Sequence, residues 1–185
     1  MKFTRAEAER VWLISDPHFD HANIIRYCHR PFRNVRQMNA VIRRNWNRTI
    51  RPDDLVYFLG DMSFGRAART PQWWLRRLHG RKIYIKGSHD RGIELSSIIP
   101  GVDKVSETEH VLVDGMDFLL VHDPSSAAVD GWNGWLIHGH NHHRRPFCDF
   151  QEKRVNVSVE AIGYKPVSLA RIINVVLSGP YSSAV

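Results

Sequence analysis

Short apolar runs recur along the chain, and most of them stop at Asp, Gly or His. Runs of this length, bounded by turn residues, are typical of buried strands. We expect strands at residues 11–15, 55–59, 83–85, 111–113, 118–121, 135–137, 155–159 and 172–177. Asp114-Gly115 lies between two of these runs and predicts a tight hairpin turn.

A different period follows Asn34, where apolar residues recur every three or four positions as far as Ile50. This spacing predicts an amphipathic helix. Asn34 with Gln37 resembles a capping box at its start.

Thr70-Pro71 opens a second predicted helix, because Pro is favoured in the first turn, and Gly80 follows its end. The tryptophans on these helical stripes are expected in the core: Trp46, Trp73 and Trp74.

Strands and helices are interspersed without repeats or low-complexity linkers, which predicts one α/β or α+β domain over residues 1–185, with a flexible tail at 178–185. Five of the expected strands end in a loop that carries Asp or His. Ligands commonly bind in such loops in layered α/β folds.

Composition fits a globular chain, with 43% hydrophobic and 24% charged residues. The net charge of +7 favours anionic partners such as phosphates or nucleic acid. However, the basic residues are spread along the chain and form no stripe with interleaved aromatics, so a solvated basic surface fits equally well.

No apolar stretch reaches the length of a membrane span, and the charged residues 1–10 do not resemble a signal peptide. Cys28 and Cys148 are far apart and form no motif, so we expect free thiols in a reducing compartment and a cytoplasmic protein.

Candidate chemistry lies in five short motifs: Asp16-Pro-His18, Gly60-Asp61, Gly87-Ser88-His89-Asp90, His122, and Gly139-His140-Asn141-His142. Taken singly, most are as consistent with turn residues or a core histidine as with a metal site. The last is stronger, because two histidines one residue apart face the same side of an extended segment and can share a metal. Gly139 would let the backbone approach that site closely.

In this order, the five motifs resemble the calcineurin-like metallophosphoesterase family, over roughly residues 11–142. The opening Ile-Ser-Asp-Pro-His-Phe-Asp-His-Ala-Asn-Ile-Ile is similar to the small stand-alone members of bacteria and phages. The resemblance implies a four-layer αββα fold, in which two mixed sheets pack face to face with helices outside both. It also implies two divalent metal ions, bridged by a carboxylate and a hydroxide, that hydrolyse phosphoesters.

Residue roles follow from the same resemblance. Asp16, His18 and His142 resemble ligands of the first metal, Asp61 the bridging ligand, and His122 and His140 ligands of the second, together with Ser88. Such ligands suit manganese, iron, zinc or nickel, and the sequence does not choose among them. Manganese is our first expectation. His89 resembles the general acid, and Asp90 would hold or tune its imidazole.

Ser88 departs from the family pattern, in which Asn supplies a carbonyl oxygen to the second metal. A hydroxyl on a shorter side chain is a poorer neutral ligand, so we expect a weakened second site and reduced activity. His21 and Asn23 are candidates for the pocket wall, and Arg91 for steering phosphate, although a solvated arginine fits as well. His138 and His143 are expected outside the ligand set.

The resulting hypothesis is hydrolysis of phosphodiesters, since a general acid helps a poor leaving group most, with 2′,3′-cyclic nucleotides as candidate substrates. Two alternatives remain. The chain could be a non-catalytic binding scaffold with this fold, as the Ser88 departure suggests, or a nuclease acting on RNA or DNA, as the charge suggests. The sequence does not predict an oligomeric state.

Overall fold

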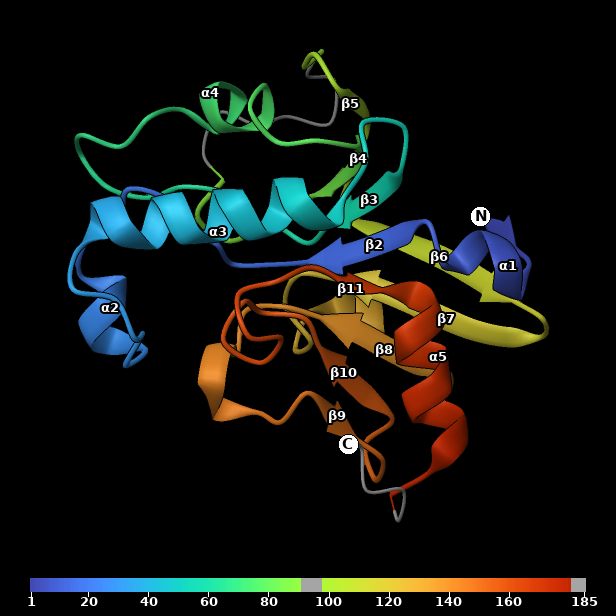
Figure 1. The fold of residues 1–185 in the computed structure, drawn as a ribbon. Helices are drawn as coiled ribbons and strands as arrows, with labels where there is room; N and C mark the ends of the chain where they lie inside the picture. Colours follow the sequence, from blue (N-terminus) through green and yellow to red (C-terminus); the bar gives the residue numbers. More distant parts are fainter. Residues whose placement is uncertain (91–97, 181–185) are drawn as a thin grey trace.

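The computed structural model describes residues 1–90 and 98–180, which form two mixed β-sheets packed face to face (Figure 1). In one sheet the strand order is β1-β6-β7-β8-β10-β9. Its strands are β1 (Lys2–Phe3), β6 (Thr108–Val113), β7 (Met116–Val121), β8 (Trp135–His138), β9 (Cys148–Asp149) and β10 (Arg154–Asn156). We call this the C-terminal sheet. The expected pair of mixed sheets is therefore confirmed.

The other sheet has the order β11-β2-β3-β4-β5, and we call it the N-terminal sheet. Its strands are β2 (Val11–Ile14), β3 (Leu55–Phe58), β4 (Arg81–Ile85), β5 (Val102–Ser106) and β11 (Val167–Ser168). The strands β2 to β5 run parallel to one another. Their carboxyl ends therefore meet at one edge, which gathers the loops that begin at Ser15, Leu59 and Lys86.

The C-terminal sheet adds loops to the same edge. Its strands β7, β8 and β10 are also parallel, and they end before His122, Gly139 and Val157. Backbone hydrogen bonds join the two sheets here, because Ser15 N donates to Val157 O and Val159 N donates to Ser15 O. The loops that carry the five candidate motifs thus lie where the carboxyl ends of both sets of parallel strands converge.

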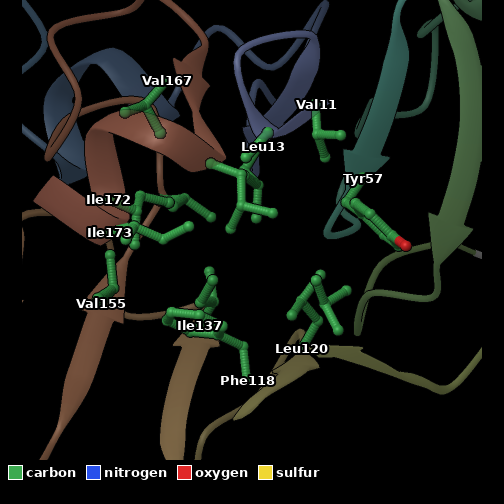
Figure 2. Packing of buried hydrophobic residues seen from close by; sticks show 14 of the residues in the cluster. Val11, Leu13, Tyr57, Phe118, Leu120, Ile137, Val155, Val167, Ile172 and Ile173 are labelled. Atoms are coloured by element: carbon green, nitrogen blue, oxygen red, sulfur yellow. The ribbon is translucent and has the colours of Figure 1, made fainter. Parts of the chain in front are cut away.

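The main core lies between the sheets (Figure 2). Leu13 and Tyr57 face Leu120 and Ile137 across it, and all four are almost completely buried. Burying one such side chain contributes roughly 1.5–3 kcal/mol. Helices α1 (Arg5–Ala8) and α5 (Leu169–Ser178) complete this core.

Three helices lie on the outer side of the N-terminal sheet: α2 (Ile24–Tyr27), α3 (Val35–Thr49) and α4 (Pro71–Leu75). The helix predicted after Asn34 is confirmed as α3, and Asn34 Oδ1 accepts a hydrogen bond from Gln37 N. The reciprocal bond of the expected capping box is displaced by one residue, since Gln37 Oε1 accepts from Arg33 N. Trp46 and Trp74 are buried in the core beneath these helices, as expected.

The outer side of the C-terminal sheet is covered differently. Leu119, Val121 and Leu136 pack there against Val129 and Trp132, which come from the segment around the short 3₁₀ helix η1 (Ala127–Val129). The segment around η1 therefore packs on this side of β7 and β8.

The strand predicted at residues 172–177 is wrong, because these residues belong to helix α5. A short, mostly apolar run does not distinguish a buried strand from a buried helix. The decisive residue lies before the run, because Ser168 caps the helix by accepting a hydrogen bond from Arg171 N. Leu169, Ile172 and Ile173 then bury one helical face. The other strand predictions and the Asp114-Gly115 hairpin are confirmed within one to three residues at each end.

Two further expectations concern the cysteines and membrane-spanning segments. Neither Cys28 nor Cys148 is in a disulfide. None of the helices within residues 1–90 and 98–180 combines the length and apolar character needed to cross a bilayer.

Candidate metal centre

The carboxyl edge of the sheets brings six proposed ligands together from four loops. Asp16 and His18 follow β2, Asp61 follows β3, His122 follows β7, and the remaining two follow β8: His140 and His142. The strand order thus brings together residues that are up to 126 positions apart in the sequence, as Asp16 and His142 are.

A first group consists of Asp16, His18 and His142, whose ligand atoms all lie within 4.8 Å of one another. His18 is only 2% exposed, and neither of its ring nitrogens has a hydrogen-bond partner among the described residues. The same holds for Asp16 Oδ1. Leaving a buried polar atom unpaired costs about 1–3 kcal/mol. A cation between these atoms would offset that cost, so this donor set fits a metal ion.

A second group consists of Asp16, Asp61 and His122, again with ligand atoms within 4.8 Å of one another. Asp61 Oδ2 lies 3.4 Å from His18 Nε2 and 3.5 Å from His122 Nε2. One oxygen of Asp61 therefore lies between a histidine of each group, where a carboxylate that joins two ions would be needed. His140 extends this group, with its Nδ1 3.3 Å from His122 Nε2.

Burial of these groups shifts their proton affinities. It raises the pKa of Asp61 above the ordinary range of a carboxyl, with Asp16 adding to the rise and the nearby His122 opposing it. It also lowers the pKa of His18 well below the usual range, helped by the positive charges of His142 and Arg30. A neutral His18 keeps the nitrogen lone pair that a metal ligand requires.

Hydrogen bonds fix the orientation of the outer ring nitrogens. His122 Nδ1 lies 2.7 Å from Leu59 O and donates to it in the tautomer that leaves Nε2 facing Asp61. His142 Nδ1 lies 3.1 Å from a carboxylate oxygen of Glu160. Such a partner on the far nitrogen is the usual support of a metal-binding imidazole. Burial lowers the pKa of His142, but hydrogen bonds with Cys28 and Glu160 outweigh it and raise the pKa to about 10.

Arg30 is a part of the site that the sequence did not reveal. Its guanidinium is buried and donates to Asp16 O, Pro17 O and Glu160 Oε1 at 2.7–2.8 Å. It therefore ties the loop of the first motif to the carboxylate behind His142. Arg30 lies in a segment without periodicity or motif, so no sequence signal pointed to it.

Backbone strain is concentrated at the same residues. Five of the proposed ligands have a positive φ of 48–66°: Asp16, His18, Asp61, His140 and His142. This left-handed region is uncommon for residues other than Gly. Strained backbone of this kind clusters at functional sites, where the surrounding structure holds it in place.

Two glycines allow the loops to approach closely. A Cβ at Gly87 would lie 2.2 Å from Asp61 Oδ1, and one at Gly139 would lie 2.5 Å from Asp16 Oδ2. Any side chain at either position would displace a proposed ligand. The close approach expected at Gly139 is confirmed.

The two histidines of the last motif do not point the same way, as an extended segment would require. The chain turns at Gly139, whose carbonyl oxygen accepts from Asn141 N, and His140 and His142 both have left-handed backbone. As a result His140 faces His122, whereas His142 lies beside His18 with ring centroids 5.2 Å apart. The motif therefore contributes one histidine to each group.

His89 and Asp90 have different positions in the loop after β4. The His89 ring is exposed and lies 5.6 Å from the His18 ring, between centroids. The buried Asp90 carboxylate accepts hydrogen bonds from the backbone N–H groups of Asp61, Met62 and Gly87. None of its hydrogen bonds within the described residues goes to the His89 imidazole. Asp90 acts on this ring through its charge, because burial lowers the pKa of His89 and the Asp90 carboxylate opposes that shift. Its hydrogen bonds join the loops after β3 and β4.

The remaining candidates are less tightly integrated. Ser88 is exposed and lines a cavity that His122 also lines. His21 packs against Phe64 and lies beside His18, with ring centroids 4.7 and 5.6 Å away, so its place in a pocket wall stays a prediction. Asn23 is exposed at the start of α2, and its side chain makes no capping bond. Arg91 lies outside the described residues.

His138 and His143 flank the last motif and take no place in either group. His138 is buried with its Nδ1 2.8 Å from Gly139 O, whereas His143 is exposed and packs against His29.

Comparison with known proteins adds a close relative. An uncharacterized protein of Methanocaldococcus jannaschii is 41% identical over 175 residues, which cover 92% of this chain and 93% of the relative. The chain belongs to the family of this archaeal protein. The Gene 66 protein of Mycobacterium phage D29 is 28% identical over 72% of this chain and 79% of its own length. No protein-family model matches the chain.

Among solved structures, a protein of unknown function from Aquifex aeolicus has a TM-score of 0.70 at 27% identity, covering 89% of this chain and 97% of its own. It has the same fold. An archaeal phosphodiesterase reaches a TM-score of only 0.41 at 15% identity, over 80% of this chain and 81% of its own, which is too low to support an inference.

Proposed function

We propose that this protein is a metal-dependent phosphodiesterase of the calcineurin-like type, with two divalent metal ions at the carboxyl edge of its sheets. The observation that carries the proposal is the buried, unpartnered Asp16 Oδ1 and His18 ring nitrogens beside Asp61 and His122. Without a cation, this arrangement buries two carboxylates and several imidazoles with unmet polar atoms.

The proposed ligand sets follow the two groups. Asp16, His18 and His142 hold the first ion, and His122 and His140 the second, with Asp61 shared between them. Carboxylate and imidazole ligands favour manganese, iron, zinc or nickel, of which manganese is our first choice. When bound, the ions supply an activated water and positive charge to stabilise the charge that develops on phosphorus oxygens.

The protein residues orient the reaction. Glu160 fixes the His142 ring, and the Leu59 carbonyl fixes the His122 ring. His89 is exposed at the rim of the site and donates a proton to the leaving oxygen. This proton matters most for esters of ordinary alcohols, which is why we propose phosphodiesters, including 2′,3′-cyclic nucleotides, as substrates.

The test uses protein stripped of metal with a chelator and then supplied with manganese. We expect hydrolysis of bis-p-nitrophenyl phosphate and 2′,3′-cyclic AMP only after manganese is added. Asp61→Asn should lower kcat at least a hundredfold, because it removes the shared charge. Asp117→Asn should leave kcat unchanged, because the Asp117 side chain is half exposed on β7 and belongs to neither group of ligands. The absence of metal-dependent turnover of any phosphoester would refute the proposal.

A further inference from the structure

A cavity of about 410 Å³ lies beside the metal centre. It is lined by His89 and by residues 63–66 and 68–71, which follow the Asp61 motif. None of the six ligands proposed above lines it, so it is a separate space that opens next to the centre.

His89 stands between this cavity and the proposed ligands. Its ring centroid is 5.6 Å from that of His18 and 4.5 Å from that of Phe64, which lines the cavity. A leaving oxygen that takes a proton from His89 therefore lies on the cavity side of the phosphorus. The group attached to that oxygen extends toward Phe64.

Phe64 offers this group an aromatic surface. It is one of the few large apolar residues that are exposed, at 37%, in the part of the chain that the structure describes. Its position is fixed by packing against His21 at 4.7 Å and against His89, between ring centroids, and by Phe64 N donating to Phe19 O. An ordered, partly open aromatic ring is the usual platform for stacking a nucleobase.

Another lining residue, Arg69, is held in place by contacts with residues outside the cavity. Asp20 accepts hydrogen bonds from Arg69 N, Arg69 Nη1 and Trp74 Nε1 at 3.0–3.1 Å. The Arg69 guanidinium also lies over the Trp73 ring, 4.6 Å from its centroid. A preformed pocket lowers the entropic cost of binding.

Arg66 differs from Arg69 in having no ion-pair partner within residues 1–90 and 98–180. It is exposed and lines the cavity. Its five N–H donors suit the carbonyl and ring-nitrogen acceptors of a base.

We propose that this cavity binds a leaving group that carries a nucleobase, with Phe64 as the stacking surface and Arg66 as the polar contact. The inference rests on the proposed phosphodiesterase function. In the reaction, a water oxygen bonds to phosphorus, the P–O bond to the nucleoside breaks, and His89 protonates the departing oxygen. The products are a phosphomonoester and a nucleoside alcohol.

The test compares two diesters of adenosine 3′-phosphate, one with methanol and one with the 5′-hydroxyl of adenosine as the leaving group. Manganese-loaded wild-type protein should show a higher kcat/KM for the second. Phe64→Ala should reduce this preference about tenfold, the scale of one stacking contact. Phe64→Tyr should retain it, and Arg66→Ala should reduce it less.

Leu177→Ala is the matched control, since Leu177 is an exposed apolar residue on α5. It should leave the preference unchanged. If wild-type protein hydrolyses both diesters and Phe64→Ala keeps the wild-type ratio, the cavity does not bind the leaving group. If it hydrolyses neither diester but still turns over bis-p-nitrophenyl phosphate, the cavity proposal fails and the proposed function stands. If it turns over no phosphoester at all, the proposed function itself fails.

Discussion

Asp16 shows that hydrogen bonds within the protein occupy only part of the polar atoms at this site. Its Oδ2 accepts hydrogen bonds from His140 N and Ser158 Oγ, both at 2.9 Å, whereas its buried Oδ1 has no partner among the described residues. The contrast indicates that one oxygen positions the carboxylate and the other is available to a ligand.

Ser88 is the residue at which we expect the site to be weakest. Replacing it by Asn adds a carbonyl oxygen on a longer side chain in the cavity that His122 lines. Ser88→Asn should tighten the weaker of two manganese sites about tenfold, equivalent to about 1.4 kcal/mol, as measured by calorimetric titration.

Ser88→Ala controls for the loss of the hydroxyl and should bind manganese as the wild type does or slightly more weakly. If Ser88→Asn changes neither metal content nor turnover, the idea that Ser88 weakens the second site is wrong.

The order of the five motifs, through its resemblance to the metallophosphoesterase family, selected Asp16, His18 and Asp61, although each motif alone is as consistent with turn residues. It did not select Arg30 or Glu160. Their contacts connect residues 130 positions apart, so they depend on the strand order and not on any local pattern. For Asp90 it predicted an effect on His89, which the structure shows as the Asp90 charge opposing the lowering of the His89 pKa by burial. It did not predict the hydrogen bonds of Asp90 to backbone N–H groups, because these are set by loop packing.

At the level of elements, α5 is where sequence periodicity and structure disagree. The run from Ile172 to Leu177 reads equally well as strand or helix, and the choice is made by its flanks. Ser168 ends β11 and caps α5, and the helix then buries Ile172 and Ile173 between the sheets.

Ser168→Ala should therefore destabilise the protein by about 1 kcal/mol, the ordinary cost of losing a helix cap. For a chain of this size, that lowers Tm by roughly 2–4 °C in a thermal unfolding scan. Ser168→Thr keeps a capping oxygen and should lose less.

Ser178→Ala, at the other end of α5, is the matched control. Its hydroxyl bonds back to Asn174 O within the helix and caps nothing. An equal loss of Tm in the Ser168 and Ser178 variants would contradict a capping role for Ser168.

At the scale of the whole molecule, the arrangement of the strands determines where the candidate site lies. Parallel strands in both sheets end at a common edge, and the backbone bonds of Ser15 join the sheets there. The resemblance to the metallophosphoesterase family implied the two mixed sheets, whereas the order of short runs predicted only an α/β or α+β domain. Neither predicted that the segment around η1 packs on the outer side of β7 and β8, because loops have no periodicity of their own.

The most direct test of two metal ions at this edge is the stoichiometry of manganese binding to metal-free protein, measured by calorimetric titration and by elemental analysis after dialysis. We expect two ions per chain at saturation, fewer for Asp61→Asn, and a stabilisation of about 5 kcal/mol, or about 2.7 kcal/mol for each site, when free manganese is a hundred times the dissociation constant of both sites. A wild-type stoichiometry of one or zero would contradict the dinuclear centre.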